Sequence, residues 1–270
     1  MKTITCRHLL TNHIKKFVPD GGYTSIFRTI GVIGDSLSSG EHESLKDGKK
    51  GFHDYFEYSW GQYIARKCGL TTINFSKGGL TCKEFFEYYI KERKNPFIDE
   101  NRCQAYIIAL GVNDMNHLKE YYPGGFGSFD DVDWDNSDNN KMSYVGQYVR
   151  IIQRLKEFEP KCRIFVMSLP KESPLRKEEA KQRKEILKFL KELTTKFPYL
   201  YLLDLWDYAP IYDKRFKRLH FCGGHMNARG YKFTGDLVAT YIDYYIRKYP
   251  DDFNQVAFIG KEVHNESVKW

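Results

Sequence analysis

Five short apolar segments, separated by segments of helical periodicity, constrain the fold of this chain more than any other feature. Each is rich in Ile, Val, Tyr or Phe and is bounded by Gly, Pro, Asn or Asp, which is typical of buried strands. They cover residues 29–33, 72–75, 104–110, 163–169 and 199–203. Apolar residues recur at three- and four-residue intervals over 60–67, 85–90, 145–155, 186–197 and 237–245, as on one face of a helix.

Strands that alternate with helices pair in parallel through right-handed crossovers. The pattern therefore predicts an α/β fold, with a parallel sheet covered by helices on both faces. Ligands of such sheets bind beyond the carboxyl ends of the strands, so the chemistry is expected just after residues 33, 75, 110 and 203. We expect one domain over residues 29–270, preceded by an N-terminal extension over residues 1–28, since no segment is typical of a linker.

Charge and composition exclude several functions. The net charge of +7 comes from 42 basic and 35 acidic side chains, and the most charged stretch, 171–196, mixes both signs instead of forming a basic stripe. We therefore expect no nucleic-acid partner. No segment approaches the roughly 20 apolar residues of a membrane span. The first residues do not resemble a signal peptide and the six cysteines form no C-x-x-C pair, so a reduced, cytoplasmic protein is expected.

A serine follows the first predicted strand, in the motif Gly34-Asp35-Ser36-Leu37. A serine on a tight turn at the carboxyl end of a strand exposes its hydroxyl, where a nucleophile must stand. The motif by itself is equally typical of a turn that opens a helix. Ser36 is therefore a candidate nucleophile that needs support from other residues.

Three further loops carry polar groups at the expected edge of the sheet. Ser76-Lys77-Gly78-Gly79 follows the second strand, and Gly111-Val112-Asn113-Asp114 follows the third. A backbone N–H at Gly79 and the side-chain amide of Asn113 could together form an oxyanion hole, although a plain strand-to-helix loop and an Asx turn would show the same residues. His225 lies in a Gly-rich loop before the last predicted helix.

These four segments, in this order, resemble the four conserved blocks of the SGNH/GDSL hydrolase family, over most of the chain from about residue 29 to 245. The resemblance implies a three-layer α/β/α sandwich with a five-stranded parallel sheet. It also implies Ser36 as nucleophile, His225 as base, and Gly79 and Asn113 as oxyanion-hole donors. Family members are mostly esterases, lipases, thioesterases and carbohydrate deacetylases that need no metal or organic cofactor, so neither is expected here.

One position departs from the family pattern. Family members usually carry an Asp three residues before the histidine, and this chain has Cys222 there. Losing the acid of a triad can cost about 10⁴ in kcat. Three alternatives remain open: a backbone carbonyl orients His225, another acid such as Asp204 or Asp207 replaces the missing one, or the protein is not catalytic.

Two other groups of residues suggest metal ligands only weakly. The spacing of His220, Cys222 and His225 matches no standard zinc site, and the acidic run 131–138 lacks the Gly and the bidentate Glu of a calcium loop.

We therefore expect a serine esterase that cleaves an acyl ester, with a short acyl chain, on a small molecule or a carbohydrate. The alternative is an impaired relative that binds a carbohydrate or lipid in the same cleft.

Overall fold

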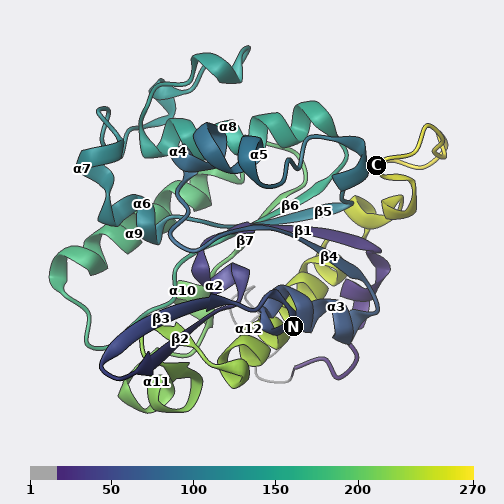
Figure 1. Cartoon of the computed structure of the whole chain (residues 1–270). Helices are drawn as coiled ribbons and strands as arrows, with labels where there is room; N and C mark the ends of the chain where they lie inside the picture. Colours follow the sequence, from purple (N-terminus) through teal and green to yellow (C-terminus); the bar gives the residue numbers. More distant parts are fainter. Residues whose placement is uncertain (1–16) are drawn as a thin grey trace, which may run out of the picture.

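The computed structural model describes residues 17–270 and has a five-stranded parallel sheet at its centre, seen nearly edge-on in Figure 1. The strand order is β4-β1-β5-β6-β7, with every neighbouring pair parallel. The strands are β1 (Thr29–Gly34), β4 (Thr71–Ser76), β5 (Ala105–Ala109), β6 (Arg163–Met167) and β7 (Leu200–Leu203). All five predicted strands are confirmed, and those predicted over 104–110 and 163–169 are shorter than expected.

Helices cover both faces of the sheet, as predicted, and give three layers (Figure 1). One face carries α2 (Ser36–Ser39), α3 (Trp60–Cys68), α10 (Leu205–Tyr208), α11 (Lys214–His220) and α12 (Ala228–Lys248). The other carries α4 (Cys82–Glu84), α5 (Ile90–Glu92), α6 (Val112–Asn116), α7 (Leu118–Tyr121), α8 (Tyr144–Phe158) and α9 (Lys177–Leu193). A π-helical segment, Phe85–Tyr89, joins α4 to α5. Short 3-10 helices span Gly22–Ile26, Phe56–Tyr58, Asp99–Asn101, Phe129–Asp131, Ser137–Asn139, Pro250–Phe253 and Val256–Phe258.

Each layer of helices forms its own hydrophobic core with the sheet. Alternate strand residues point to opposite faces, so Ile33 and Ile108 join the core under α8 while Val32 and Ile107 join the core under α3 and α12. The apolar stripes recognised in the sequence become the buried faces of α8, α9 and α12. Because all five strands are parallel, the loops that follow β1, β4 and β5 emerge at the same end of the sheet, where the site forms.

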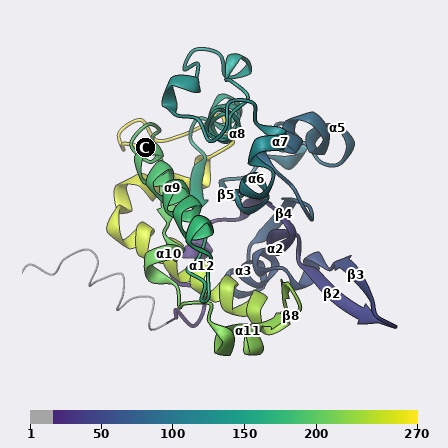
Figure 2. The same ribbon diagram turned by 90° about the vertical axis from the view of Figure 1, so that its left-hand side faces the viewer.

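Two antiparallel hairpins lie outside the central sheet and were not expected from the sequence. The larger pairs β2 (Glu41–Lys46) with β3 (Lys49–Asp54) and projects from the body of the molecule (Figure 2). Its two-residue turn has positive φ at both Asp47 (53°) and Gly48 (72°), the geometry of a type I′ turn. The smaller pairs β8 (Phe221–Cys222) with β9 (His225–Met226).

The predicted N-terminal extension over residues 1–28 lies partly outside the described residues, which begin at residue 17. Its described part packs on α12, where the Thr24 hydroxyl donates to the carbonyl of Ala239 at 2.7 Å and the Tyr23 N–H donates to Asp243 at the same distance. Within residues 17–270, none of the helices has the length and apolar character needed to cross a membrane.

Candidate active site

Ser36 is the first residue of α2 and stands directly beyond the carboxyl end of β1. Asp35 caps this short helix by accepting the N–H of Leu37 at 3.0 Å. Gly34 lets the helix fold back closely onto the strand, because a Cβ there would lie 2.2 Å from the hydroxyl of Ser38. The half-buried Ser36 side chain forms no hydrogen bond within the described part of the chain, so its hydroxyl is open to a ligand.

Asp35 is itself an electrostatic feature of the site. Its side chain is buried, and burial raises the pKa of this carboxyl to about 7, with smaller contributions from the negative charges of Asp114 and Glu41. The hydrogen bond from the Leu37 N–H opposes this rise. A carboxyl that titrates near neutrality therefore stands beside the candidate nucleophile.

The predicted oxyanion-hole donors follow β4 and β5, the two strands that flank β1 in the sheet. Gly79 sits in the loop after β4, with φ of 75°, and this loop is tied to the turn before Ser36 by the Lys77 N–H, which donates to the carbonyl of Gly34 at 3.3 Å. Asn113, in α6 after β5, donates from its side-chain amide to the carbonyl of Leu80 at 3.4 Å. The structure thus brings the loops of Gly79 and Asn113 together.

The buried carboxylate of Asp114 connects the loop of Gly79 to the helix that carries Asn113. Asp114 accepts hydrogen bonds from the backbone N–H of Cys82, at 2.8 Å, and from the Tyr122 hydroxyl. Its side chain is completely buried, and burial raises its pKa above the usual range. Asp114 therefore fixes the first turn of α4, just after Gly79, against α6, which carries Asn113.

His225 and Ser36 line one cavity of about 270 Å³. His225 begins β9, and α2 lies against β9 and β2, so both side chains reach the same space from different parts of the chain. The rest of the wall is largely apolar and includes Ala109, Val112 and Leu169. Gly79 and Asn113 do not line this cavity. In residues 17–270 the His225 ring forms no hydrogen bond with Ser36; its nitrogens face two carboxylates instead.

The two carboxylates come from β2 of the larger hairpin. Nε2 of His225 lies 2.9 Å from Oε1 of Glu41, and Nδ1 lies 3.7 Å from Oε2 of Glu43. All three side chains are largely buried, with 17% of His225, 13% of Glu41 and 8% of Glu43 exposed. Residues two apart on a strand point to the same face, which is why both carboxylates meet one imidazole.

The pKa values of the two carboxyl groups are shifted in opposite directions. A hydrogen bond from Lys50 and a second from the Gly224 N–H, at 2.7 Å, hold the pKa of Glu43 below its ordinary value. Burial raises the pKa of Glu41, although the nearby His225 works in the opposite direction. The surroundings of Glu43 therefore favour its charged form beside the histidine, and burial of Glu41 favours its neutral form.

The family model that matches this chain covers residues 32–233 and describes the GDSL-like lipase/acylhydrolase family. The chain belongs to this family. Its matched segment runs from β1 into α12 and includes Ser36, Gly79, Asn113 and His225. The resemblance noted in the sequence is thereby confirmed, as is the expected α/β/α fold. Comparison with curated proteins finds none that matches the chain significantly.

Solved structures similar to this chain include carbohydrate esterases of low sequence identity. A family-two carbohydrate esterase from Clostridium thermocellum is 13% identical with a TM-score of 0.54, covering 82% of this chain and 64% of that one. A family-two enzyme from Corynascus, which also has a carbohydrate-binding domain, is 16% identical with a TM-score of 0.53, covering 82% and 67%. A family-three esterase from Talaromyces cellulolyticus is 12% identical with a TM-score of 0.50, covering 82% and 98%. These likenesses show the shared fold.

The alternative acids considered for this GDSL-like protein lie elsewhere. Asp204 caps α10 and pairs with Lys191 at 3.2 Å, and Asp207 pairs with Lys191 and Lys171, both at 3.3 Å. Neither contacts His225 within the described residues. Cys222, at the position of the usual acid, is exposed and is the cross-strand partner of His225. Glu41 and Glu43 were missed because nothing in the sequence indicates which face of a polar hairpin meets a distant loop.

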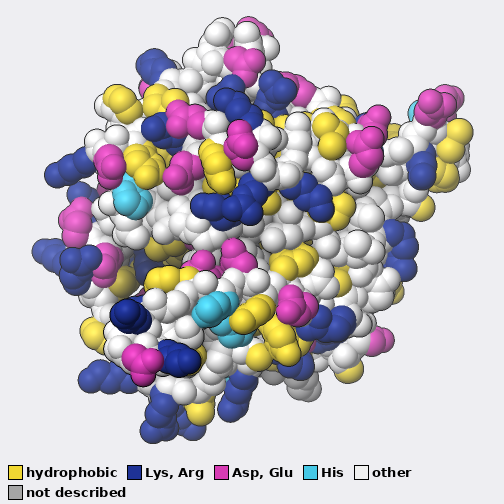
Figure 3. Space-filling view, viewed as in Figure 1, with side chains coloured by type: hydrophobic (Ala, Val, Ile, Leu, Met, Phe, Trp, Pro, Cys, Tyr) yellow, Lys and Arg dark blue, Asp and Glu magenta, His cyan; other side chains and the backbone are white. Residues whose placement is uncertain are grey.

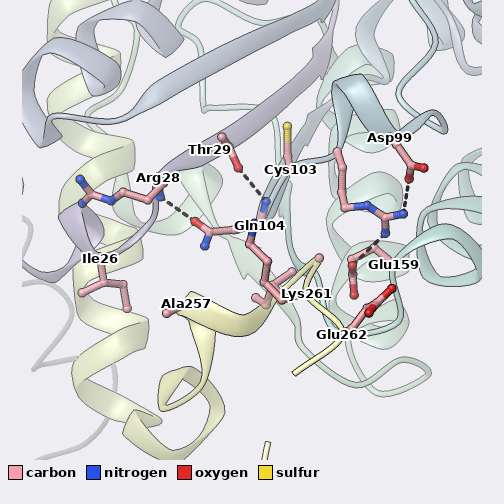
Figure 4. Close-up of a pocket in the computed structure, with 13 residues that line it drawn as sticks. Ile26, Arg28, Thr29, Asp99, Cys103, Gln104, Glu159, Ala257, Lys261 and Glu262 are labelled. Atoms are coloured by element: carbon pink, nitrogen blue, oxygen red, sulfur yellow. Dashed lines mark hydrogen bonds and ion pairs between the residues drawn. The ribbon is translucent and has the colours of Figure 1, made fainter. Parts of the chain in front are cut away.

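Other predicted or visible features of this GDSL-like protein stand apart from Ser36. His220 packs against the rings of Phe216 and Phe233. A second cavity, of about 930 Å³, lies at the amino-terminal end of the strands, where β1 and β5 begin (Figure 4). Its wall includes Gln104, which accepts the Arg28 N–H at 2.6 Å, and contains none of the predicted site residues. This larger cavity is therefore at the end of the strands opposite to Ser36 and His225.

Proposed function

We propose that this protein is a serine esterase that hydrolyses a short acyl ester, with Ser36 as nucleophile and His225 as base. The observation that carries the proposal is that Ser36 and His225, which are 189 positions apart, line one cavity at the carboxyl ends of the strands. The chain's membership of a family of ester hydrolases supports the same reaction class. A cavity of about 270 Å³ with largely apolar walls suits a short acyl group.

The reaction proceeds in two steps. His225 removes the proton of Ser36, the hydroxyl oxygen forms a bond to the ester carbonyl carbon, and the negative oxygen that results is held by the Gly79 N–H and the Asn113 amide. The N–H of Ser36 is available as a third donor. The ester C–O bond breaks as His225 protonates the leaving alcohol. Water then attacks the acyl-enzyme in the same way and frees the acid.

A carbohydrate is the alcohol that the surroundings of His225 favour. Phe52 is 55% exposed and its ring lies 5.6 Å from the His225 ring; Tyr55 and Tyr58, 44% and 46% exposed, pack around His42 on the same hairpin. Hydrophobic and histidine side chains gather over the β2–β3 hairpin, beside acidic side chains in a hollow (Figure 3). Exposed aromatic rings beside a cleft offer flat surfaces on which a sugar can stack. The three fold neighbours described above are also carbohydrate esterases.

The second candidate function is a carbohydrate-binding domain without catalysis. The observation in its favour is the position of His225, whose Nε2 is engaged by Glu41 instead of Ser36. Such a protein would keep the cleft and its aromatic rim while leaving Ser36 unactivated.

The test is hydrolysis of p-nitrophenyl acetate and of an acetylated oligosaccharide by the wild-type chain and by Ser36→Ala. Ser44→Ala, on the exposed face of the hairpin, is the matched control. We expect loss of turnover in Ser36→Ala alone. Equal rates in the wild type and Ser36→Ala would rule out Ser36 as nucleophile. Binding of the oligosaccharide without turnover by the wild type would favour the second candidate function.

A further inference from the structure

The loop that carries His225 is shaped around the carboxylate of Glu43. A Cβ on Gly223 would lie 2.5 Å from Cδ of Glu43, and a Cβ on Gly224 would lie 3.2 Å from its Oε2. The Gly224 N–H donates to the same oxygen at 2.7 Å. Gly223 also has φ of 71°, which favours glycine independently. The two glycines therefore form a cradle that a side chain at either position would fill, and Glu43 occupies it.

The two ring nitrogens of His225 face different parts of the site. Glu41, whose Oε1 contacts Nε2, also places its Oε2 only 2.2 Å from where a Cβ on Gly78 would lie. Gly78 precedes the oxyanion-hole residue Gly79, so Nε2 is the nitrogen on the side of the oxyanion loop. Nδ1 lies on the other side, is buried, and has no hydrogen-bond partner within residues 17–270. Its nearest carboxylate is that of Glu43, 3.7 Å away.

We propose that Glu43, carried by the β2–β3 hairpin, is the acid that orients His225 and stabilises its cation, in place of a side chain at position 222. This inference rests on the proposed esterase function. Glu43 meets the requirements of a positioning residue: its carboxylate is nearly buried, is fixed by the Gly224 N–H, and faces the nitrogen remote from the oxyanion loop. The β2–β3 hairpin thus supplies the carboxylate that is missing at position 222, where the β8–β9 hairpin has a cysteine.

Glu41 has a different part in this arrangement. Its carboxylate occupies the space between Nε2 of His225 and the oxyanion loop, where the reacting ester must enter. His225 can accept the Ser36 proton only after this contact is released. Glu41 therefore occupies Nε2 in the free protein and is displaced when the substrate binds. Removal of its charge should not weaken the base, whereas removal of the Glu43 charge should.

The test is the rate at which a fluorophosphonate labels Ser36 in the full chain, since labelling needs the activated serine but no knowledge of the natural substrate. Labelling forms the Ser36 O–P bond and releases fluoride, with the serine proton passing to His225. The matched pair is Glu43→Gln and Glu41→Gln, two isosteric changes two residues apart on one strand. We expect Glu43→Gln to slow labelling by at least about tenfold, within the roughly 10⁴-fold cost of losing a triad acid. We expect Glu41→Gln to be labelled at least as fast as the wild type.

Rescue separates an orienting acid from a residue needed only for folding. Cys222 is the cross-strand partner of His225, so Cys222→Asp in the Glu43→Gln background returns a carboxylate to the family's position and should restore labelling. Glu43→Asp, which keeps the charge but shortens the side chain, is the second variant if Glu43→Gln does not fold. We expect an intermediate rate for Glu43→Asp, with a melting temperature close to that of the wild type.

The outcomes are distinct. A wild type whose Ser36 is not labelled would overturn the proposed function, and this inference with it. A labelled wild type with Glu43→Gln or a folded Glu43→Asp reacting at the same rate would overturn the role of Glu43 and leave the esterase function standing. Slow labelling of Glu41→Gln but not of Glu43→Gln would assign the acid to Glu41. A slow Glu43→Gln that Cys222→Asp does not quicken would exclude substitution for position 222.

Discussion

Asp114 holds the backbone N–H of Cys82 at 2.8 Å and so fastens the loop that provides Gly79 to the helix that provides Asn113. The two donors of an oxyanion hole are useful only if they point at one place before the reaction begins. The contact between Asp114 and Cys82 is buried, where solvent cannot compete for either group. This buried contact holds α4 against α6 independently of the solvent-exposed residues around Gly79.

Asp114→Ala should lower both stability and activity. The change leaves the Cys82 N–H and the Tyr122 hydroxyl without their acceptor, and each buried unpaired group costs about 1–3 kcal/mol. Chemical denaturation measures the stability, and turnover of a p-nitrophenyl ester measures the activity. Asp114→Asn, which keeps an acceptor oxygen, is the control and should lose less of both. Equal losses in the two variants would show that charge, and not hydrogen bonding, is what the site needs here.

Asn113→Ala should reduce kcat by about 10²–10³ with little change in KM. Its amide is assigned to the oxygen that becomes negative only as the reaction proceeds, and removal of one such donor costs about 2.7–4 kcal/mol of transition-state stabilisation. In the free protein this amide makes only a long contact with the Leu80 carbonyl, at 3.4 Å, so little stability should be lost. A change in KM alone, measured by steady-state kinetics, would contradict the assignment.

Asp35 should make folding stability fall as the pH rises from about 4 to about 7. Its pKa is about 7 in the folded protein because of burial and 3.8 otherwise, so between these values the folded state binds a proton that the unfolded state has lost. Ionising the buried carboxyl then costs about 4 kcal/mol, at 1.36 kcal/mol for each pH unit. Asp35→Asn removes this titration while keeping an acceptor for the Leu37 N–H.

Denaturation of the wild type and Asp35→Asn at several pH values measures this effect as their difference in free energy of unfolding. We expect that difference to move in favour of Asp35→Asn as the pH rises, and to level off above about pH 7. Asp135→Asn, the same change at an exposed position, serves as the control. A flat difference for Asp35→Asn as well would mean that Asp35 is ionised at low cost.

Cys222→Asp in the otherwise unchanged chain should leave ester hydrolysis similar or raise it. With Glu43 already beside Nδ1 of His225, a second carboxylate adds little orientation. Cys222 is exposed, so the substitution buries no new charge. Steady-state hydrolysis of a p-nitrophenyl ester checks this, and Cys222→Ser is the control of similar size. A collapse of activity in a folded Cys222→Asp would reveal a specific role for the cysteine.

The parallel sheet could be predicted because its strands are buried on both faces and therefore appear as continuous apolar segments, such as Ile30 to Ile33. The sequence Thr81-x-x-Glu84 is likewise a local signal for the start of a helix, and Thr81 caps α4 by accepting the Glu84 N–H. These features depend on local sequence. The order of the blocks in turn indicated which loops should share one edge of the sheet.

The hairpin and its carboxylates could not be predicted because they depend on contacts between distant segments. Over residues 41–54 the side chains are mostly polar on both faces, so neither strand shows the alternation that marks a half-buried strand. Glu43 meets the Gly224 N–H 181 residues further along the chain. The available signal was the pair Asp47-Gly48, which is typical of a tight hairpin turn.

The type I′ turn at Asp47 and Gly48 carries a consequence for tolerance to change. A strand that slips by one residue against its partner turns every side chain to the opposite face. Lengthening this turn by a single residue would permit such a slip, pointing His42 and Ser44 at the imidazole and both glutamates away from it. The length of this turn thus governs which chemical groups of the hairpin reach the cleft, so one inserted residue there should disturb the site as much as a substitution of the glutamates themselves.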